Sequence, residues 1–104
     1  MYYHGSVERA RIDIDIAELI IDEAKSAYIA TKGVDFDDVL EVLRGTPRFF
    51  VSHDERGPRY AMLGPNRADR FLVVAIAHVD ARVWRVVTAY WLRQSRGRRL
   101  YEEG

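Results

Sequence analysis

The chain has 104 residues, of which 48% are hydrophobic and 31% are charged, and this balance is typical of one folded globular domain. It contains no cysteine, which excludes disulfide bonds and thiolate metal sites and favours an intracellular location. The net charge is zero, but the first 55 residues carry 6 basic and 12 acidic side chains, whereas the rest carry 10 arginines and 4 acidic side chains. This asymmetry indicates either an anionic partner for the C-terminal half or mutual neutralisation of the two halves.

No apolar run approaches the ~20 residues that cross a bilayer, and the N-terminal residues do not have the pattern of a secretory signal. We therefore expect a cytoplasmic protein that makes no contact with a membrane. The expected organisation is a single domain over residues 1–104, in which residues 1–10 form a flexible N-terminal extension.

The first expected element is a strand over residues 11–16, where isoleucine alternates with charged residues. A helical pattern follows, because one face would carry Ile16, Ile20, Ala24, Ala27 and Thr31. Asp15 and Glu18 have the spacing of a capping box, which predicts a helix that begins near Ile16; a later start at Asp22 is the alternative. Gly33 is well placed to end this helix in a left-handed conformation.

A second helix is expected after Asp35, which can cap it. Its apolar residues repeat at the spacing of one helix face and are Phe36, Val39, Leu40 and Leu43. Gly45 and Pro47 end the helix.

The second half of the chain predicts an antiparallel meander. Strands over residues 48–53 and 59–63 are joined by a turn at Gly57-Pro58, and more apolar strands over residues 71–79 and 83–92 are joined by a turn at Asp80-Ala81. Residues 93–103 are expected to form a short helix or an ordered tail, because Gly97 weakens a helix.

These elements predict an α+β fold in which two N-terminal helices pack on one face of a twisted antiparallel sheet of three to five strands. The short C-terminal helix or tail follows the sheet. The residues expected in the core are Val39, Leu40, Leu43, Val74, Ile76 and Val87.

The common enzyme signatures are missing from the sequence. There is no glycine-rich phosphate loop and no nucleophile elbow. His4, His53 and His78 are far apart and lack the spacing of metal ligands, so we expect no metal site and no cofactor. A single histidine in a strand is more often structural than catalytic, and we expect His78 to be hydrogen-bonded at the end of its strand.

Arginine beside aromatic residues is the remaining pattern, in Arg59-Tyr60, Trp84-Arg85, Tyr90-Trp91 and Arg98-Arg99-Leu100-Tyr101. Guanidinium groups bind phosphate, and unpaired bases stack on aromatic rings. The alternative is that the tryptophans belong to the core. Arg85 would share a strand face with Val83, Val87 and Ala89, so it either pairs with a carboxylate or lines a groove.

Segments over roughly residues 21–103 resemble, in the same order, those of the BrnT toxin family. Its Trp-Asp-x-x-Lys pattern is similar to residues 21–25, and its Lys-His-Gly-Val-x-Phe-x-x-Ala pattern to residues 32–39. Its Arg-Tyr-x-x-x-Gly strand resembles Arg59-Tyr60-Ala61-Met62-Leu63-Gly64, and its apolar third strand resembles Phe71-Leu72-Val73-Val74. Its Arg-Ile-Ile-Ser-Ala strand resembles Arg85-Val86-Val87-Thr88-Ala89, and its Arg-Arg-x-Tyr-Glu ending resembles residues 98–103.

The resemblance implies a RelE-like fold and a metal-independent ribonuclease that acts as the toxin of a bacterial type II toxin–antitoxin system. It also implies a cognate antitoxin with a DNA-binding part and leaves a higher-order toxin–antitoxin assembly open. Lys32 stands where the family has histidine, Tyr90 where it has arginine, and Gly57-Pro58 interrupts a Glu-Arg-Arg run. The alternatives are therefore a degenerate toxin that binds antitoxin or RNA without cleavage, and a housekeeping interaction domain.

For cleavage by 2′-hydroxyl attack, the candidate phosphate clamps are Arg59 and Arg85, with Lys32 as a second cation and Tyr90 or Tyr101 as the acid. The candidate RNA-binding residues are Lys25, Arg93, Arg96, Arg98 and Arg99.

Overall fold

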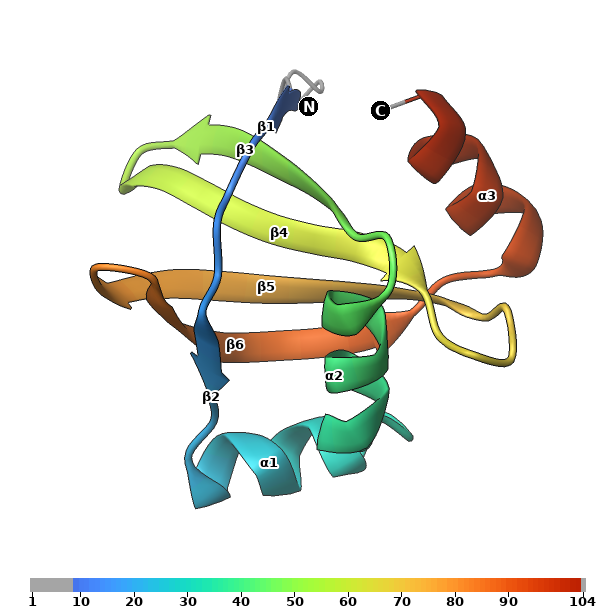
Figure 1. Ribbon diagram of the computed structural model, residues 1–104, viewed down its shortest axis with the longest axis horizontal. Helices are drawn as coiled ribbons and strands as arrows, with labels where there is room; N and C mark the ends of the chain where they lie inside the picture. Colours follow the sequence, from blue (N-terminus) through green and yellow to red (C-terminus); the bar gives the residue numbers. More distant parts are fainter. Residues whose placement is uncertain (1–8, 104) are drawn as a thin grey trace.

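The computed structural model describes residues 9–103, which form six strands and three helices (Figure 1). The elements in chain order are β1 (Ala10–Ile12), β2 (Glu18–Ile20), α1 (Glu23–Ala30), α2 (Phe36–Arg44), β3 (Arg48–Asp54), β4 (Gly57–Pro65), β5 (Phe71–Asp80), β6 (Val83–Trp91) and α3 (Gln94–Glu103). The predicted α+β class is confirmed. The prediction for residues 1–10 lies outside the described residues except at its end, where Ala10 begins β1. Within the described range, no helix is long and apolar enough to cross a membrane.

The strands form one sheet in the order β1-β3-β4-β5-β6-β2. The four long strands are the predicted antiparallel meander, in which each strand pairs with the next along the chain. Two short strands extend it at the edges, because β1 pairs antiparallel with β3 and β2 pairs parallel with β6. The prediction of three to five antiparallel strands behind two N-terminal helices is therefore wrong in detail: the sheet has six strands, is mixed and begins before the first helix.

The segment between β1 and β2 runs across one face of the sheet, from the edge beside β3 to the edge beside β6 (Figure 1). Ile12, Ile14 and Ile16 pack from it against the core. Alternate positions reach one face only in an extended backbone, which explains why no helix begins at Ile16. Asp15, the expected cap, instead forms an ion pair with Arg82, with 2.7 Å between the carboxylate and Nε.

Both N-terminal helices are set by their capping residues. Helix α1 takes the later of the two predicted starts, where Asp22 accepts a hydrogen bond of 2.7 Å from the backbone N–H of Lys25. Gly33 follows it with a φ of 75°, the predicted left-handed conformation. Helix α2 matches its prediction, because Asp35 caps it in a capping box with Asp38.

The main core lies between one face of the sheet and the elements that cover this face, which are α1, α2 and the segment that joins β1 to β2. Its fully buried side chains include Ile29, Val39, Val42, Met62, Leu72, Val74 and Val86. Of the residues predicted in the core, Val39, Val74 and Ile76 are buried. The half-buried ones are Leu40, Leu43 and Val87. The two leucines flank the buried side of α2, and the valine is the extra residue of a β-bulge in β6.

Helix α3 packs on the opposite, outer face of the sheet, against β4 and β5 (Figure 1). It covers Phe71 and Leu63, which are buried apart from the main core cluster. Gly97 makes the contact possible, because a Cβ at this position would lie 2.4 Å from the Cβ of Phe71. The C-terminal segment is therefore the helical alternative of the prediction, and the glycine that weakens the helix lets it dock.

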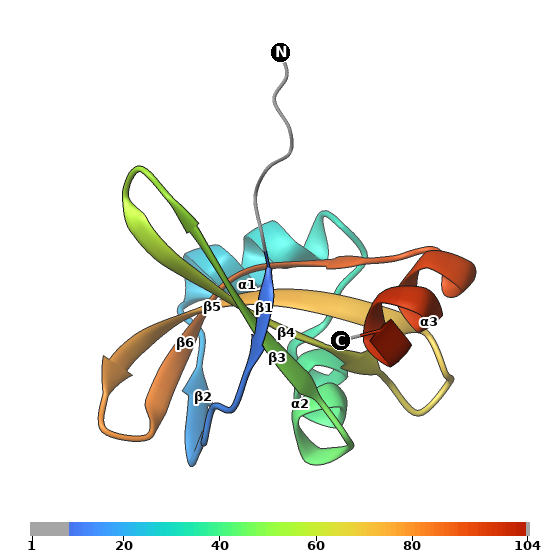
Figure 2. The same cartoon turned by 90° about the horizontal axis from the view of Figure 1, so that it is seen from above.

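The two hairpin turns lie at the end of the sheet away from α3 (Figures 1 and 2). Glu55-Arg56 joins β3 to β4, and Ala81-Arg82 joins β5 to β6. Both turns differ from their predicted positions, because Gly57-Pro58 and Asp80 belong to strands. In the described part of the chain, no helix covers the outer face between these turns and α3.

Candidate nucleic-acid interface

A shallow trough, which we call the outer trough, lies on this uncovered face near the hairpin turns. It encloses about 300 Å³ across β4, β5 and β6. It is lined by Pro58, Arg59, Tyr60, Ala75, Ile76, Ala77, His78, Arg85 and Val87. Strand alternation turns Ala75 and Ala77 into the trough, and turns Ile76 and His78 to the other face. The floor is therefore made of methyl groups and backbone, which leaves room for a ligand between longer side chains.

The two predicted phosphate clamps flank this floor. Ala77 pairs with Arg85 on β6, and continuing the register of β4 with β5 by one position places Arg59 beside Ala77 on the other side. Neighbouring strands lie about 4.8 Å apart, so the two arginine backbones are about 10 Å apart. Both arginines project from the same face, and a single phosphate between them is within reach of both guanidinium groups.

Neither arginine is held in a buried ion pair. Arg85 is exposed, and its side chain makes no hydrogen bond or ion pair with any residue in the described range 9–103. Arg59 donates from Nε to Asp54 at 3.0 Å, in a pair whose side chains are 51% and 45% exposed. Exposed ion pairs contribute little to stability because water screens them, so a bound anion can displace Asp54 from Arg59. The sequence predicted that Arg85 either pairs with a carboxylate or lines a groove. The structure places Arg85 in the lining of the outer trough.

Asp54 tunes the availability of Arg59. The backbone N–H of Arg56, and then the Arg59 side chain, lower the pKa of Asp54 below its ordinary value. The carboxylate therefore stays ionised at neutral pH and competes with a bound anion for Arg59.

A group that we call the Lys32 cluster adjoins the outer trough and consists of Tyr28, Lys32, Thr88 and Tyr90. The Nζ of Lys32 lies 3.4 Å from the Thr88 hydroxyl, 4.7 Å from the centre of the Tyr28 ring and 6.0 Å from that of the Tyr90 ring. Thr88 pairs with Ala75 of the trough floor, so the cluster continues the trough along β6. Four of the five predicted catalytic residues therefore share this region, namely Arg59, Arg85, Lys32 and Tyr90.

A β-bulge in β6 aligns the trough with the Lys32 cluster. Arg85 and Tyr90 are an odd number of positions apart, and a regular strand would turn them to opposite faces. The register of the β5–β6 pair shifts by one residue at Val87, which is extra. Past the bulge Tyr90 is exposed on the outer face, whereas Ala89 is buried in the core. The prediction that Arg85 and Ala89 share a face is therefore wrong.

Tyr101, the fifth predicted catalytic residue, lies on α3, away from the outer trough. Its hydroxyl hydrogen-bonds to Thr46, 2.8 Å from Oγ1, and its ring packs on Phe71. Arg48 lies 4.3 Å from the centre of the same ring and donates a hydrogen bond to the Tyr101 carbonyl. These contacts hold α3 on the sheet, so the structure assigns Tyr101 a place in the fold and does not bring it to the trough.

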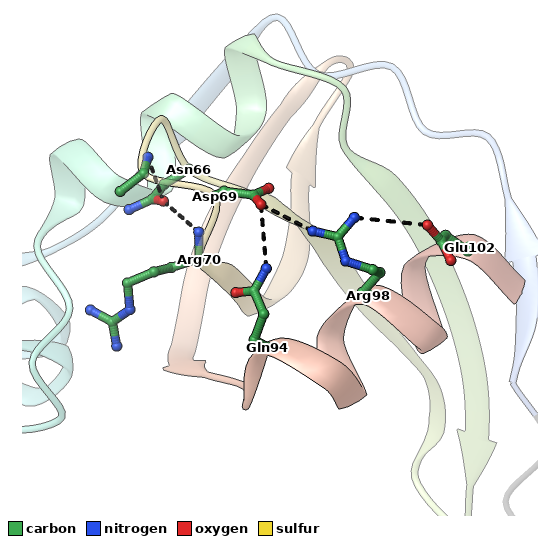
Figure 3. Close-up of polar contacts among 7 residues, drawn as sticks. Asn66, Asp69, Arg70, Gln94, Arg98 and Glu102 are labelled. Atoms are coloured by element: carbon green, nitrogen blue, oxygen red, sulfur yellow. Dashed lines mark hydrogen bonds and ion pairs between the residues drawn. The ribbon is translucent and has the colours of Figure 1, made fainter.

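The predicted RNA-binding arginines lie on or next to α3. Arg98 pairs with Asp69 at 3.0 Å and with Glu102 at 3.9 Å, while Gln94 donates to the same Asp69 carboxylate (Figure 3). These contacts tie α3 to the loop between β4 and β5. The arginines that are exposed and whose side chains form no bond within residues 9–103 are Arg93, Arg96 and Arg99. None of these three arginines lines the outer trough.

Two residues of the Lys32 cluster were missed in the sequence, Tyr28 and Thr88. Tyr28 stands four positions before Lys32, which is the spacing of neighbours on a helical surface and was the available signal. Thr88 gave no signal, because its place beside the trough floor depends on the bulge. Lys25, a predicted RNA-binding residue, lies half-buried on α1, and no described contact joins its side chain to the trough.

Neither of the two described histidines, His53 and His78, turns its side chain into the trough. The Nε2 of His78 lies 2.8 Å from the carbonyl oxygen of Ala81, and the ring packs edge-on against Trp84, so the predicted hydrogen-bonded role is confirmed. His53 is exposed at the end of β3, and His4 lies outside the described residues. Within residues 9–103, no three His, Asp or Glu side chains are grouped so that they could hold a metal ion.

Comparison with known proteins places the chain in one family. The family described as a domain of unknown function, DUF4258, matches residues 26–91, and the chain belongs to this family. The matched region begins in α1 and ends with β6, so it contains both trough arginines and the whole Lys32 cluster. No curated protein and no solved structure matches the chain.

Proposed function

We propose that this DUF4258 domain is a metal-independent ribonuclease with a RelE-like fold, and that it acts in the bacterial cytoplasm as the toxin of a type II toxin–antitoxin pair. The observation that carries the proposal is the pair of exposed arginines, Arg59 and Arg85, on either side of the alanine floor. The resemblance to the BrnT family supports the same function, because both arginines stand where that family has arginine.

The proposed reaction is attack of an RNA 2′-hydroxyl on the adjacent phosphorus. The bond from phosphorus to the 2′-oxygen forms, the bond to the 5′-oxygen breaks, and a cyclic phosphate and a 5′-hydroxyl result. Negative charge builds up on the non-bridging phosphate oxygens. Arg59 and Arg85 project from the same face of the sheet, so both guanidinium groups can stabilise this charge once Arg59 has left Asp54. Positioning of the phosphate adds to the rate.

The proton transfers are assigned to water. Tyr90, the predicted acid, is four positions of β5 away from the level of Arg85, about 13 Å along the strand, which is too far for proton transfer to a 5′-oxygen on a phosphate held by the two arginines. The Lys32 ammonium adds positive charge for the bound RNA. The nucleophilic hydroxyl loses its proton to water, because the ring of His78 lies on the other face of the sheet and Asp54 is held in its ionised, weakly basic form. A slow enzyme is the consequence.

The first prediction is that purified protein cleaves RNA without added metal and at the same rate in EDTA, because the charge on the phosphate is met by guanidinium groups. The measurement is cleavage of a labelled single-stranded RNA in the presence and absence of EDTA. The product should carry a cyclic phosphate. Activity that disappears in EDTA and returns with Mg²⁺ would exclude the proposed mechanism.

The second candidate function is a degenerate toxin that binds RNA or antitoxin without cleavage. The side chains of the outer trough favour this second function. Among the described residues, no imidazole or carboxylate group points into the trough, so no side chain there is an obvious general base. Lys32 and Tyr90 also differ from the family pattern in this region. Folded, antitoxin-free protein that binds RNA and never cleaves it would support this second function.

We also propose an antitoxin segment that covers the outer trough. Buried arginines are costly unless carboxylates or carbonyl groups meet them, so an acidic segment is the expected occupant. The acidic first half of the chain is the competing surface, where a basic segment would dock.

A charge-reversal pair discriminates between these surfaces. We expect Arg85→Glu to weaken co-purification with the product of the neighbouring gene and to remove its salt sensitivity. Asp37→Lys is the matched control, because Asp37 is exposed on α2 and its side chain makes no described contact. Arg98 is unsuitable for reversal, since it holds α3 through Asp69. A complex that is weakened only by Asp37→Lys would place the antitoxin on the acidic face.

A further inference from the structure

The Lys32 cluster has features that phosphate binding alone does not require. Tyr28 is 49% exposed and Tyr90 is 43% exposed, and they are two of the few large apolar side chains on the described surface that are so open. They come from α1 and β6, and the centres of both rings lie within 6.0 Å of one ammonium group, that of Lys32. The cation is within the range of a cation–π contact to both rings, so one ammonium group links two exposed aromatic side chains beside the trough.

The position of the cluster relative to the outer trough is set by the sheet register. Arg85 pairs with Ala77 and Tyr90 pairs with Val73, so the two residues are four positions of β5 apart. At about 3.3 Å for each residue of a strand, this separation is about 13 Å. Adjacent bases of a stacked helix rise by only about 3.4 Å. An RNA strand that contacts both Arg85 and Tyr90 must therefore span this distance, either with several stacked nucleotides or with fewer nucleotides in an extended conformation.

We infer that Tyr28 and Tyr90 form a base-stacking subsite next to the phosphate clamp, and that the substrate is unpaired RNA. Paired bases are stacked inside a duplex and present no free face, whereas the bases of a single strand can stack on exposed aromatic rings. The Lys32 ammonium is near both rings and neutralises the phosphate that enters with the stacked nucleotide. This inference rests on the proposed ribonuclease function and assigns its substrate class.

The test measures binding in the absence of cleavage. The probe is a single-stranded oligonucleotide with 2′-O-methyl groups, which cannot undergo 2′-hydroxyl attack. It is compared with the same strand annealed to its complement and with an abasic strand of equal length, which keeps the phosphates and lacks the bases. We expect the wild-type protein to bind the single strand more tightly than either of the other two.

The variants separate stacking from charge. We expect Tyr28→Ala and Tyr90→Ala each to weaken binding of the single strand by about fivefold to 150-fold, the range measured for one base on one aromatic ring, and to leave binding of the abasic strand unchanged. Tyr28→Phe and Tyr90→Phe keep the rings and should bind within about twofold of wild type. Val79→Ala, at a residue that is 47% exposed near the hairpin turn, controls for the loss of surface apolar area.

The inference is overturned if the alanine variants bind the single strand as wild type does, or if the duplex or the abasic strand binds as tightly as the single strand. The melting temperature of each variant establishes that it is folded. If only the ribonuclease proposal is wrong, the result differs. The protein then leaves RNA with free 2′-hydroxyl groups intact, but Tyr28→Ala and Tyr90→Ala still weaken binding of the single strand.

Discussion

Arg59→Ala and Arg85→Ala are each expected to slow RNA cleavage by roughly 100- to 1000-fold and to abolish growth inhibition. A group that stabilises transition-state charge typically contributes about 3–4 kcal/mol, which gives a rate loss of this size. The measurements are single-turnover cleavage of a labelled RNA and growth after induction of each variant.

The fold should survive both substitutions. Arg85 has no ion-pair partner in the described structure, so its removal leaves no carboxylate unpaired. Removal of Arg59 leaves the Asp54 carboxylate hydrated, because the pair is already exposed to water.

Two further variants complete this experiment. Arg85→Lys keeps the charge and loses the bidentate geometry, so an intermediate rate is expected. Arg67→Ala is the matched control, because the Arg67 side chain is exposed, makes no described contact and lies outside the trough. If Arg59→Ala and Arg85→Ala are both as toxic as wild type, the active site lies elsewhere, at the arginines on and next to α3. If both variants unfold, Arg59 and Arg85 are needed for the fold.

Gly97→Ala is expected to lower the free energy of unfolding by about 1–3 kcal/mol, and Gly97→Val by more. The added Cβ would lie 2.4 Å from the Cβ and 2.7 Å from the Cγ of Phe71, far inside van der Waals contact. Phe71 is buried in a strand and cannot move away cheaply. The higher helix propensity of alanine, about 1 kcal/mol relative to glycine, offsets part of the loss.

Urea unfolding measures this effect. Ser95→Ala is the control, since Ser95 is exposed on the same helix and receives no such contact. The loss of α3 docking should also release Tyr101 from Thr46, which a change in tyrosine fluorescence would report. Equal stability of Gly97→Ala and wild type would mean that α3 is not held against Phe71 in solution.

The elements with a strong local signal were predicted well from the sequence. Helix α2 has an apolar stripe, a capping aspartate and a terminating glycine, and all three act within a few residues of one another. Strands β5 and β6 are rich in β-branched and aromatic residues, and the four long strands follow one another through short connections, so an antiparallel meander is their simplest pairing.

The segment before α1 shows where local signals are insufficient. Its isoleucines fit both a strand and the start of a helix, and Asp15 has an acceptable partner for a capping box at Glu18. The choice is made by distant residues, because β1 and β2 pair with β3 and β6 and Asp15 reaches Arg82. A parallel pair between residues 18–20 and 83–85 leaves no trace in either segment alone.

The sequence by itself determined which residues of the candidate site carry charge and aromatic rings. Arg59, Arg85, Lys32 and Tyr90 were identified from arginine chemistry and from the family resemblance. Only the tertiary structure decided which of them meet. The sequence pattern identifies Val87 only as an ordinary strand residue. It forms a β-bulge because Val86 and Thr88 pair with the adjacent residues Ile76 and Ala75 of β5, which leaves Val87 without a partner. That extra residue turns Tyr90 to the face of Arg85, and strand period alone would have placed the two on opposite sides of the sheet.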